Sequence, residues 1–262
     1  LEWWQRLNDL KPPLTLPEPR CTPGPLPPEP PVYHAVVALA QDRLARGRDW
    51  LVRDSDYGAK APPAHGAIKA KVNAALVAAV RTHIGVEELP RLLAADLRRL
   101  LLLLDTPLYG TLSALSEAVP MLRCCQQVVV PQADLGHYYE MLRGGDFYPG
   151  VRAQRLDHWL CANAGFGFQC LFAFLDYECR LAGALQARLC PAADVMRYFR
   201  LGYAAAPVSI LALTVGLEPP AETPEEVDAF VRHEAAVNGY CAELLETWKY
   251  RMATLLYVVR RL

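Results

Sequence analysis

Apolar residues in this chain recur mainly at intervals of three and four positions, the spacing of one face of an α-helix. The clearest stripe begins at Ile68 and returns every fourth residue through Ile84. Gly85 follows directly, where a helix C-terminal cap belongs. A second stripe, rich in leucine, extends from Leu89 to Leu104. These patterns predict two helices that each bury one side.

The C-terminal region carries the strongest helical signal. Thr223-Pro-Glu-Glu226 has the form of a capping box, in which the Thr223 hydroxyl and the Glu226 carboxylate each satisfy a backbone N–H of the other residue. Apolar residues keep helical spacing from there to Leu262, and only Gly239 interrupts them. A helix over this range would be about 60 Å long, at a rise of about 1.5 Å per residue. It would form the spine of the fold.

The remaining segments also favour helices. Residues 151–189 show helical spacing with interruptions near Gly165, and Pro191 and Pro207 each stand where a short helix would begin. Val128 to Val130 is a short β-branched run, too short to indicate a sheet. The sequence therefore predicts an all-α fold, an irregular multi-helix bundle around a long C-terminal helix.

Composition divides the chain into three parts. Residues 1–10 resemble a short N-terminal helix, and residues 11–31 include ten prolines, which favour an extended proline-rich strap or linker. Residues 32–262 are predicted to form a single helical domain. The whole chain is 53% apolar and 21% charged, enough to bury a sizeable core.

The charge balance argues against a general attraction to nucleic acid or anionic membranes, because 27 basic residues face 28 acidic ones and the net charge is −1. Arginine outnumbers lysine 22 to 5. Together with abundant alanine, leucine and proline, this bias is typical of a GC-rich viral or vertebrate genome.

The eight cysteines indicate a reducing compartment, since a chain this large does not need the disulfide framework of a small protein and several cysteines lie in apolar, helix-like stretches. We therefore expect an intracellular protein of the cytoplasm or nucleus. No apolar run reaches the roughly 18 residues that a membrane span needs. The longest, Ala204 to Leu217, is interrupted by Pro207.

Common catalytic motifs are absent. The chain has no Gly-x-Ser-x-Gly elbow and no phosphate-binding P-loop, and Gly165-Phe-Gly167 follows a predicted helix where a dinucleotide loop would follow a strand. His158 and Cys161, three residues apart, are a weak candidate metal pair without a Cys-x-x-Cys clip. We therefore predict a protein that is not an enzyme and has neither a cofactor nor a metal.

A cluster of aromatic residues suggests a protein-binding surface around Gly144-Gly145, because tyrosine buries a large area and keeps a polar tip. The alternative is that these rings plug one end of the bundle. The opening helix adds two tryptophans, which dock either on their own domain or on a partner. The candidate protein-binding residues are Tyr138, Tyr139, Phe147, Tyr148, Trp3 and Trp4.

These observations favour a non-enzymatic helical scaffold or adaptor domain that binds other proteins. One alternative is a nucleic-acid-binding regulatory domain, because the densest basic stretch holds Arg43, Arg46, Arg48 and Arg53 beside Trp50 and Tyr57. Another is a carrier of a lipid or other apolar ligand, with a cavity lined by Phe166, Phe168, Phe172 and Phe174.

Overall fold

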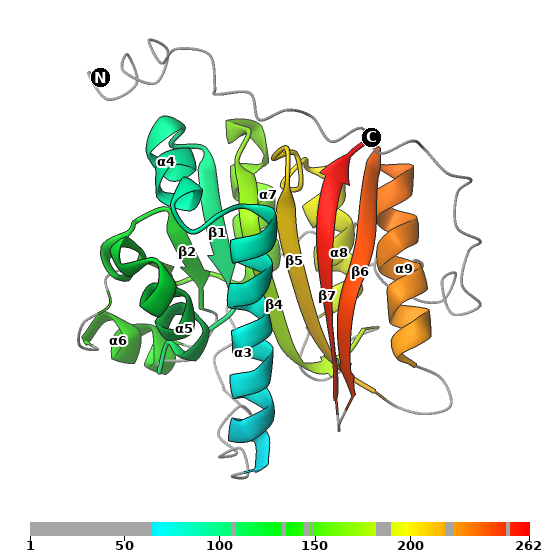
Figure 1. The fold of residues 1–262 in the computed structure, drawn as a ribbon, viewed down its shortest axis with the longest axis horizontal. Helices are drawn as coiled ribbons and strands as arrows, with labels where there is room; N and C mark the ends of the chain where they lie inside the picture. Colours follow the sequence, from blue (N-terminus) through cyan, green and yellow to red (C-terminus); the bar gives the residue numbers. More distant parts are fainter. Residues whose placement is uncertain are drawn as a thin grey trace.

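The computed structural model describes residues 64–105, 108–132, 135–143, 147, 149–181, 190–217, 223–249 and 252–262. Within these ranges, seven strands form one sheet in the order β3-β2-β1-β4-β5-β7-β6, and helices cover both of its faces (Figure 1). The all-α helical bundle predicted from the sequence is therefore wrong. The predicted short helix and proline-rich strap of residues 1–31 lie outside the described residues.

The first five strands of the sheet are parallel to their neighbours, whereas β7 pairs antiparallel with both β5 and β6. β7 follows β6 in the chain but lies between β5 and β6 in the sheet. The strands are β1 (Arg99–Leu103), β2 (Val128–Pro131), β3 (Gly150–Arg152), β4 (Gln169–Arg180), β5 (Ser209–Gly216), β6 (Tyr240–Lys249) and β7 (Met252–Arg261).

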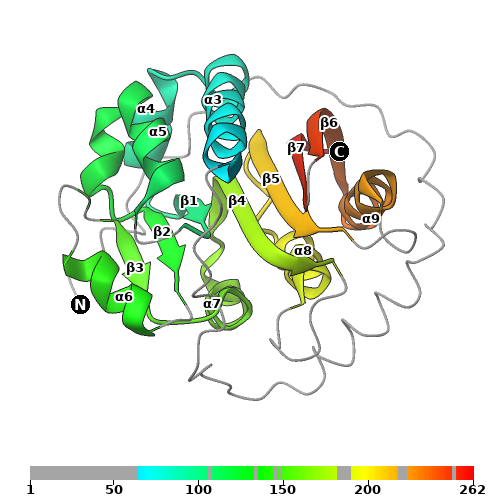
Figure 2. The same cartoon turned by 90° about the horizontal axis from the view of Figure 1, so that it is seen from below.

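The helices divide between the two faces of the sheet (Figure 2). We call the face covered by α3 (Ala64–His83), α4 (Glu88–Ala95) and α5 (Gly110–Ala118) the α3 face. The opposite α8 face carries α7 (Leu156–Asn163), α8 (Pro191–Arg200) and α9 (Pro224–Val237). The other described elements are α6 (Leu135–Arg143), beside β3, and two short 3-10 turns, η1 (Pro120–Cys124) and η2 (Ala164–Phe166).

The leucine run of β1 explains why helical spacing misled the sequence prediction. Leu101 and Leu103 pack into the core of the α3 face, whereas Leu100 and Leu102 pack into the core of the α8 face. A parallel strand covered by helices on both sides is apolar at every position, so it lacks the alternation of a half-exposed strand. The predicted helix through Leu104 is replaced by α4 and β1.

The predicted 40-residue C-terminal helix is correct only in its first part. Glu226 N donates to Thr223 Oγ1 at 3.3 Å and Thr223 N to Glu226 Oε2 at 2.9 Å, so the capping box is confirmed. The helix ends at Val237, and Gly239 adopts a left-handed φ of 82° before β6 begins. The chain beyond Gly239 forms the antiparallel pair β6 and β7.

Some of the other predicted helices are confirmed and others are wrong. The helix with Ile68–Ile84 spacing is confirmed as α3, and Gly85, with φ of 95°, donates from its N–H to Val80 O at 2.8 Å as a C-terminal cap does. Pro191 does begin a helix. Pro207 precedes β5, and residues 151–189 hold parts of β3 and β4 as well as α7, so helix predictions there are wrong.

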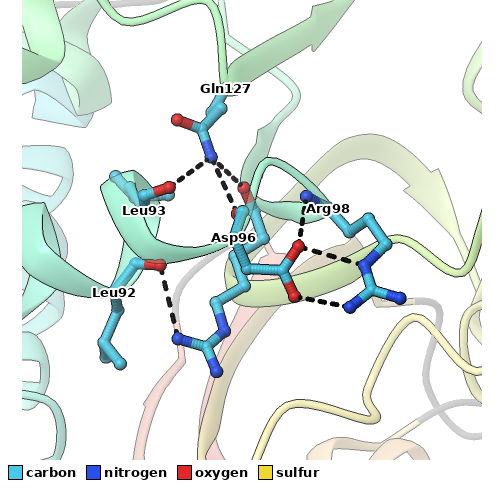
Figure 3. A network of polar contacts seen from close by, with 6 residues as sticks. Leu92, Leu93, Asp96, Arg98 and Gln127 are labelled. Atoms are coloured by element: carbon cyan, nitrogen blue, oxygen red, sulfur yellow. Dashed lines mark hydrogen bonds and ion pairs between the residues drawn. The ribbon is translucent and has the colours of Figure 1, made fainter. Parts of the chain in front are cut away.

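A hydrogen-bond network joins α4, β1 and β2 at the amino ends of the strands (Figure 3). The Gln127 side-chain amide donates to the carbonyl oxygens of Leu93, Asp96 and Arg99, at 2.9, 3.2 and 2.8 Å. The Asp96 carboxylate accepts from the backbone and guanidinium of Arg98. These contacts satisfy the end of α4 and fix where β1 begins, at the edge opposite the candidate site.

None of the helices in the described ranges is long and apolar enough to cross a membrane. Cys124, Cys125, Cys161 and Cys170 are free thiols. The predicted reducing, intracellular compartment stays a prediction.

Candidate functional site

The sheet has a switch point between β1 and β4. The chain leaves β1 toward β2 and β3 on one side and returns to the other side of β1 at β4. In doubly wound sheets, ligands bind beyond the carboxyl ends of the strands at such a point. We call the carboxyl ends of β1, β2 and β4 with the residues that follow them the ligand edge.

Two carboxylates, Asp105 and Asp176, belong to the ligand edge. Leu103 of β1 pairs with Phe174 of β4, and both side chains belong to the core of the α3 face. Asp176 stands two residues further along β4 and pairs with Lys69 of α3, whereas Asp105 lies two residues past the end of β1 and caps α5, so both side chains lie toward the α3 face. The switch point is therefore flanked by two acidic groups from strands that are distant in sequence.

Asp105 caps the helix that follows β1. Its Oδ2 accepts hydrogen bonds from the backbone N–H groups of Thr111 and Leu112, each at 3.0 Å. The carboxylate is buried, with 5% of the residue exposed. It thus occupies the backbone donors at the N-terminus of α5 and places a negative charge where the helix dipole favours one.

Tyr109 gives the loop after β1 its shape. It has φ of 49° and ψ of 40°, and no other described residue except glycine has a positive φ. Its buried hydroxyl donates to Met141 O at 3.0 Å, and its ring lies 5.3 Å from that of Phe147, centroid to centroid. Burial, with the nearby charge of Asp105, raises the pKa of Tyr109 to about 12. The side chain therefore anchors the loop to α6 as a neutral donor.

Gly110 leaves space open beside this loop, because an added Cβ would meet no atom within 4 Å in the described structure. Asn73 of α3 holds the same loop from the other side. Its side-chain amide donates to Gly110 O at 3.2 Å, and its Oδ1 accepts from Thr111 Oγ1 at 3.4 Å. One turn earlier on α3, Lys69 Nζ lies 3.1 Å from Asp176 Oδ2. α3 thereby ties both strand ends together.

Gln132 completes the ligand edge on the β2 side. It follows β2 directly, and its backbone N–H donates to Arg152 O at 2.8 Å, which ties it to the end of β3. Its side-chain amide lies 3.9 Å from Met141 Sδ. A primary amide at this position offers both a donor and an acceptor to a ligand.

The aromatic residues predicted as a protein-binding surface are partly brought together. Tyr138 and Tyr139 lie on α6 with ring centroids 5.3 Å apart, and 55% of Tyr139 is exposed. Tyr138 and Phe147 pack against the core of the α3 face, and the Arg123 guanidinium lies 5.7 Å from the Phe147 ring centroid. Their role in binding a partner stays a prediction. Tyr148, Trp3 and Trp4 lie outside the described residues.

The remaining candidates do not assemble into sites in the described part of the chain. His158 and Cys161 lie on α7, and the described residues contain no group of three or more potential metal ligands. Phe172 and Phe174 are buried on β4, whereas half of Phe166 is exposed, so the four phenylalanines do not line one cavity. Arg43, Arg46, Arg48 and Arg53 lie outside the described residues.

Sequence reasoning missed Asp105, Asn73, Lys69, Gln132 and Asp176. A signal for Asp105 was present: an apolar run ends at Leu104, an acid follows directly, and Gly110 opens an amphipathic segment. That order, strand then turn then helix, is the start of a doubly wound unit. It was hidden because the leucines were interpreted as a helical stripe.

No model of a protein family matches the chain, and no curated protein matches it. Among solved structures, magnesium protoporphyrin IX methyltransferase from Synechocystis, with bound SAM, matches at 17% identity and a TM-score of 0.42, covering 84% of this chain and 90% of that one. EvdMO1 matches at 13% identity and a TM-score of 0.40, covering 87% and 47%. TnmH matches at 13% identity and a TM-score of 0.30, covering 87% and 69%.

These findings correct the function predicted from the sequence. The non-enzymatic helical scaffold and the apolar-ligand carrier were both inferred from a helical bundle, and the chain instead forms a doubly wound sheet with a ligand edge. The prediction that the chain is not an enzyme rested on the same helical bundle, and it is withdrawn together with that bundle.

Proposed function

We propose that the chain is an enzyme that binds S-adenosylmethionine at the ligand edge and transfers its methyl group to an acceptor. The observation that carries this proposal is the contact of the Asp105 carboxylate with the first N–H groups of α5. In doubly wound folds that bind dinucleotides, the corresponding N–H groups hold the pyrophosphate. Here the Asp105 carboxylate already occupies those N–H donors, and its negative charge would repel an anionic ligand.

The charges at the ligand edge therefore favour a cationic nucleoside over an anionic one. Asp105 caps α5 just beyond the end of β1, and Asp176, on the neighbouring strand β4, pairs with Lys69 at 3.1 Å. S-Adenosylmethionine is a nucleoside whose sulfonium gives it a positive charge. Bound there, it supplies an electrophilic methyl group that a nucleophile displaces from sulfur.

The residues of the ligand edge fit such a nucleoside. The open space beside Gly110 admits a ligand close to the backbone. Gln132 stands 22 residues after Gly110 at the end of β2, near the position from which an acid binds the ribose in dinucleotide folds. The Gln132 amide can both donate hydrogen bonds to ribose hydroxyls and accept them. The Asp105 carboxylate would lie near the positive charge of the sulfonium. Asp176 is placed to accept a hydrogen bond from the nucleophile.

The loop departs in one respect from glycine-rich nucleotide loops, since Asp105-Thr-Pro-Leu-Tyr-Gly110 has a single glycine. Tyr109 takes the left-handed conformation that glycine would supply, at a cost of about 1–2 kcal/mol. Its hydroxyl contact with Met141 O and its burial offset that cost. The turn therefore keeps the required backbone shape without a glycine at this position.

Equilibrium binding measured by calorimetry tests the proposal. We expect S-adenosylmethionine to bind more tightly than its uncharged-sulfur product S-adenosylhomocysteine, and NADH and ATP to bind weakly. Asp105→Asn should lower the affinity for S-adenosylmethionine about tenfold, about 1.4 kcal/mol, and the affinity for the product less.

The matched control is Asp96→Asn, which removes a carboxylate from the opposite edge of the sheet. It should leave both affinities unchanged while the protein remains folded. Failure of S-adenosylmethionine to bind, or tighter binding of NADH or ATP, would overturn the proposal.

A further inference from the structure

The end of β4 is held from both faces of the sheet. Asp176 and Tyr177 are consecutive strand residues, so their side chains project in opposite directions. On the α3 face, Asp176 pairs with Lys69 at 3.1 Å. On the α8 face, the hydroxyl of the buried Tyr177 donates to Asp194 Oδ2 at 2.7 Å. The strand that carries Asp176 to the ligand edge is thus fixed below by a phenol–carboxylate pair.

Asp194 belongs to the first turn of α8 and is 4% exposed. Its second oxygen, Oδ1, accepts from Arg197 Nη1 at 3.0 Å. The Nε of Arg197 is buried without a hydrogen-bond partner, so this contact is the main compensation for a buried positive charge. A buried carboxylate that accepts on both oxygens is the central acceptor of the cluster.

A second ion pair from α7 faces Asp194. Arg155 and Asp157 form a bidentate pair, with both N···O distances at 2.9 Å. Burial, followed by the negative charge of Asp157, raises the pKa of Asp194 to about 6, while Arg197, Tyr177 and Arg155 act in the opposite direction. The groups around Asp194 are therefore a neutral phenol from β4 and charged side chains from Arg155, α7 and α8, and with burial they set its protonation near neutral pH.

We infer that Tyr177 is a positioning residue, which the Asp194 carboxylate fixes so that β4 presents Asp176 at the ligand edge. This inference rests on the proposed function for the role of Asp176, but the fixation itself is a property of the unliganded chain. In the charged state, Asp194 accepts from Tyr177 and Arg197 together. Protonation turns one carboxyl oxygen into a donor and leaves the other as a neutral acceptor, so acidification removes the negative charge that strengthens both contacts.

Hydrogen exchange of the unliganded protein, measured by mass spectrometry, tests the fixation directly. Tyr177→Phe removes one hydroxyl and keeps the ring, and it should speed exchange of the amides at the end of β4 roughly tenfold. Tyr203→Phe is the matched control. Its buried hydroxyl donates to Leu160 O at 2.8 Å beside the start of β4, and its loss should leave the end of β4 unchanged.

A pH series separates positioning from a merely structural effect. After correction for intrinsic exchange rates, the end of β4 should exchange faster as the pH falls through about 6 in the wild type. Asp194→Asn should abolish this inflection. Asp157→Asn removes a negative charge that raises the pKa of Asp194, so it should move the inflection to lower pH.

Affinity for S-adenosylmethionine provides the second readout. It should fall several-fold on acidification in the wild type, stay level in Asp194→Asn, and be lower in Tyr177→Phe than in Tyr203→Phe. Unchanged exchange at the end of β4 in Tyr177→Phe, or an inflection that persists in Asp194→Asn, overturns the inference. If S-adenosylmethionine does not bind at any pH, the proposed function fails and the exchange data still decide whether Asp194 fixes the strand.

Discussion

Lys69 of α3 and Asp176 of β4 are 107 positions apart in the chain, yet Lys69 Nζ lies 3.1 Å from Asp176 Oδ2. The contact crosses from a helix that precedes the sheet to the far side of the switch point. Because Asn73, one turn later on α3, holds the loop after β1, a single helix face spans both strand ends.

The Lys69–Asp176 pair should contribute little to global stability. About 37% of the Lys69 side chain is exposed, so solvent screens the pair. A double-mutant cycle of Lys69→Met and Asp176→Asn, measured by urea unfolding, should give a coupling energy of about 0.2–1 kcal/mol. A coupling above about 2 kcal/mol would show that the pair is structural, and would weaken the assignment of Asp176 to the ligand.

Gly110→Ala should separate ligand binding from folding. The added methyl group meets no atom of the described structure, and Gly110 is the first residue of a helix, so the unfolding free energy should change by less than about 1 kcal/mol. The same methyl group enters the space that we assign to the ligand. We expect the affinity for S-adenosylmethionine to fall at least about tenfold; an unchanged affinity would place the ligand elsewhere.

Position 109 should be more stable with glycine than with alanine, the reverse of the order expected inside a helix. Both substitutions remove the same ring, but only glycine adopts φ of 49° without strain, so Tyr109→Gly should be more stable than Tyr109→Ala by about 1 kcal/mol. Tyr198, buried within α8, provides the control. There alanine should be the more stable replacement by about 1 kcal/mol. Thermal unfolding of the four variants measures both differences.

Helices whose sequence signals lie within a few consecutive residues could be predicted from the sequence. The stripe from Ile68 and the capping box at Thr223 correspond to α3 and α9, because periodic burial and side-chain capping act within a few residues. The C-terminal strands could not be predicted in the same way. Leu255 and Val259 have helical spacing, but the intervening residues of β7 are buried as well, so the spacing carried no information about which face was covered.

The candidate site was harder to predict because its parts meet only in the sheet. Asp105 and Asp176 reach the same edge of the sheet through the pairing of β1 with β4, in which Leu103 lies beside Phe174. A bulge after Leu100 sets that register, and no pattern in either strand alone reports it. Recognising β1 as a strand would have been sufficient to find Asp105, whereas Asp176 requires the strand order.

Gln127→Ala tests the network at the amino edge. One amide group satisfies three backbone carbonyl oxygens there, and its removal leaves them without that donor. We expect a loss of about 1–3 kcal/mol in unfolding free energy, measured in urea. Gln154→Ala, at an exposed position, should change it by less than about 0.5 kcal/mol. Equal effects of the two substitutions would contradict the structural role of Gln127.

The buried Asp194 should give the unfolding free energy a distinct pH dependence. Its pKa is about 6 in the folded protein and 3.8 ordinarily, so between these values the folded state binds a proton that the unfolded state has released. Stability from this group is therefore greatest below about pH 4 and declines as the pH rises to about 6. The decline is on the order of 3 kcal/mol at most.

The difference between the wild type and Asp194→Asn, followed by urea unfolding from pH 4 to pH 7, isolates this contribution. Acidification should thus stabilise the whole fold while it loosens the end of β4, because it relieves the burial of a charge and weakens the contacts made by that charge. A difference that does not vary with pH would show that Asp194 does not titrate in this range.

The place of β7 in the sheet has a consequence for how the chain acquires its structure. β6 is translated before β7, but it reaches the sheet only through β7, which lies between it and β5. Until residues 252–261 emerge from the ribosome, the edge of β5 has no partner and β6 has nowhere to bind. Pairing at this side therefore waits for the synthesis of β7, and until then the exposed β5 edge is where chaperones or aggregation would compete with folding.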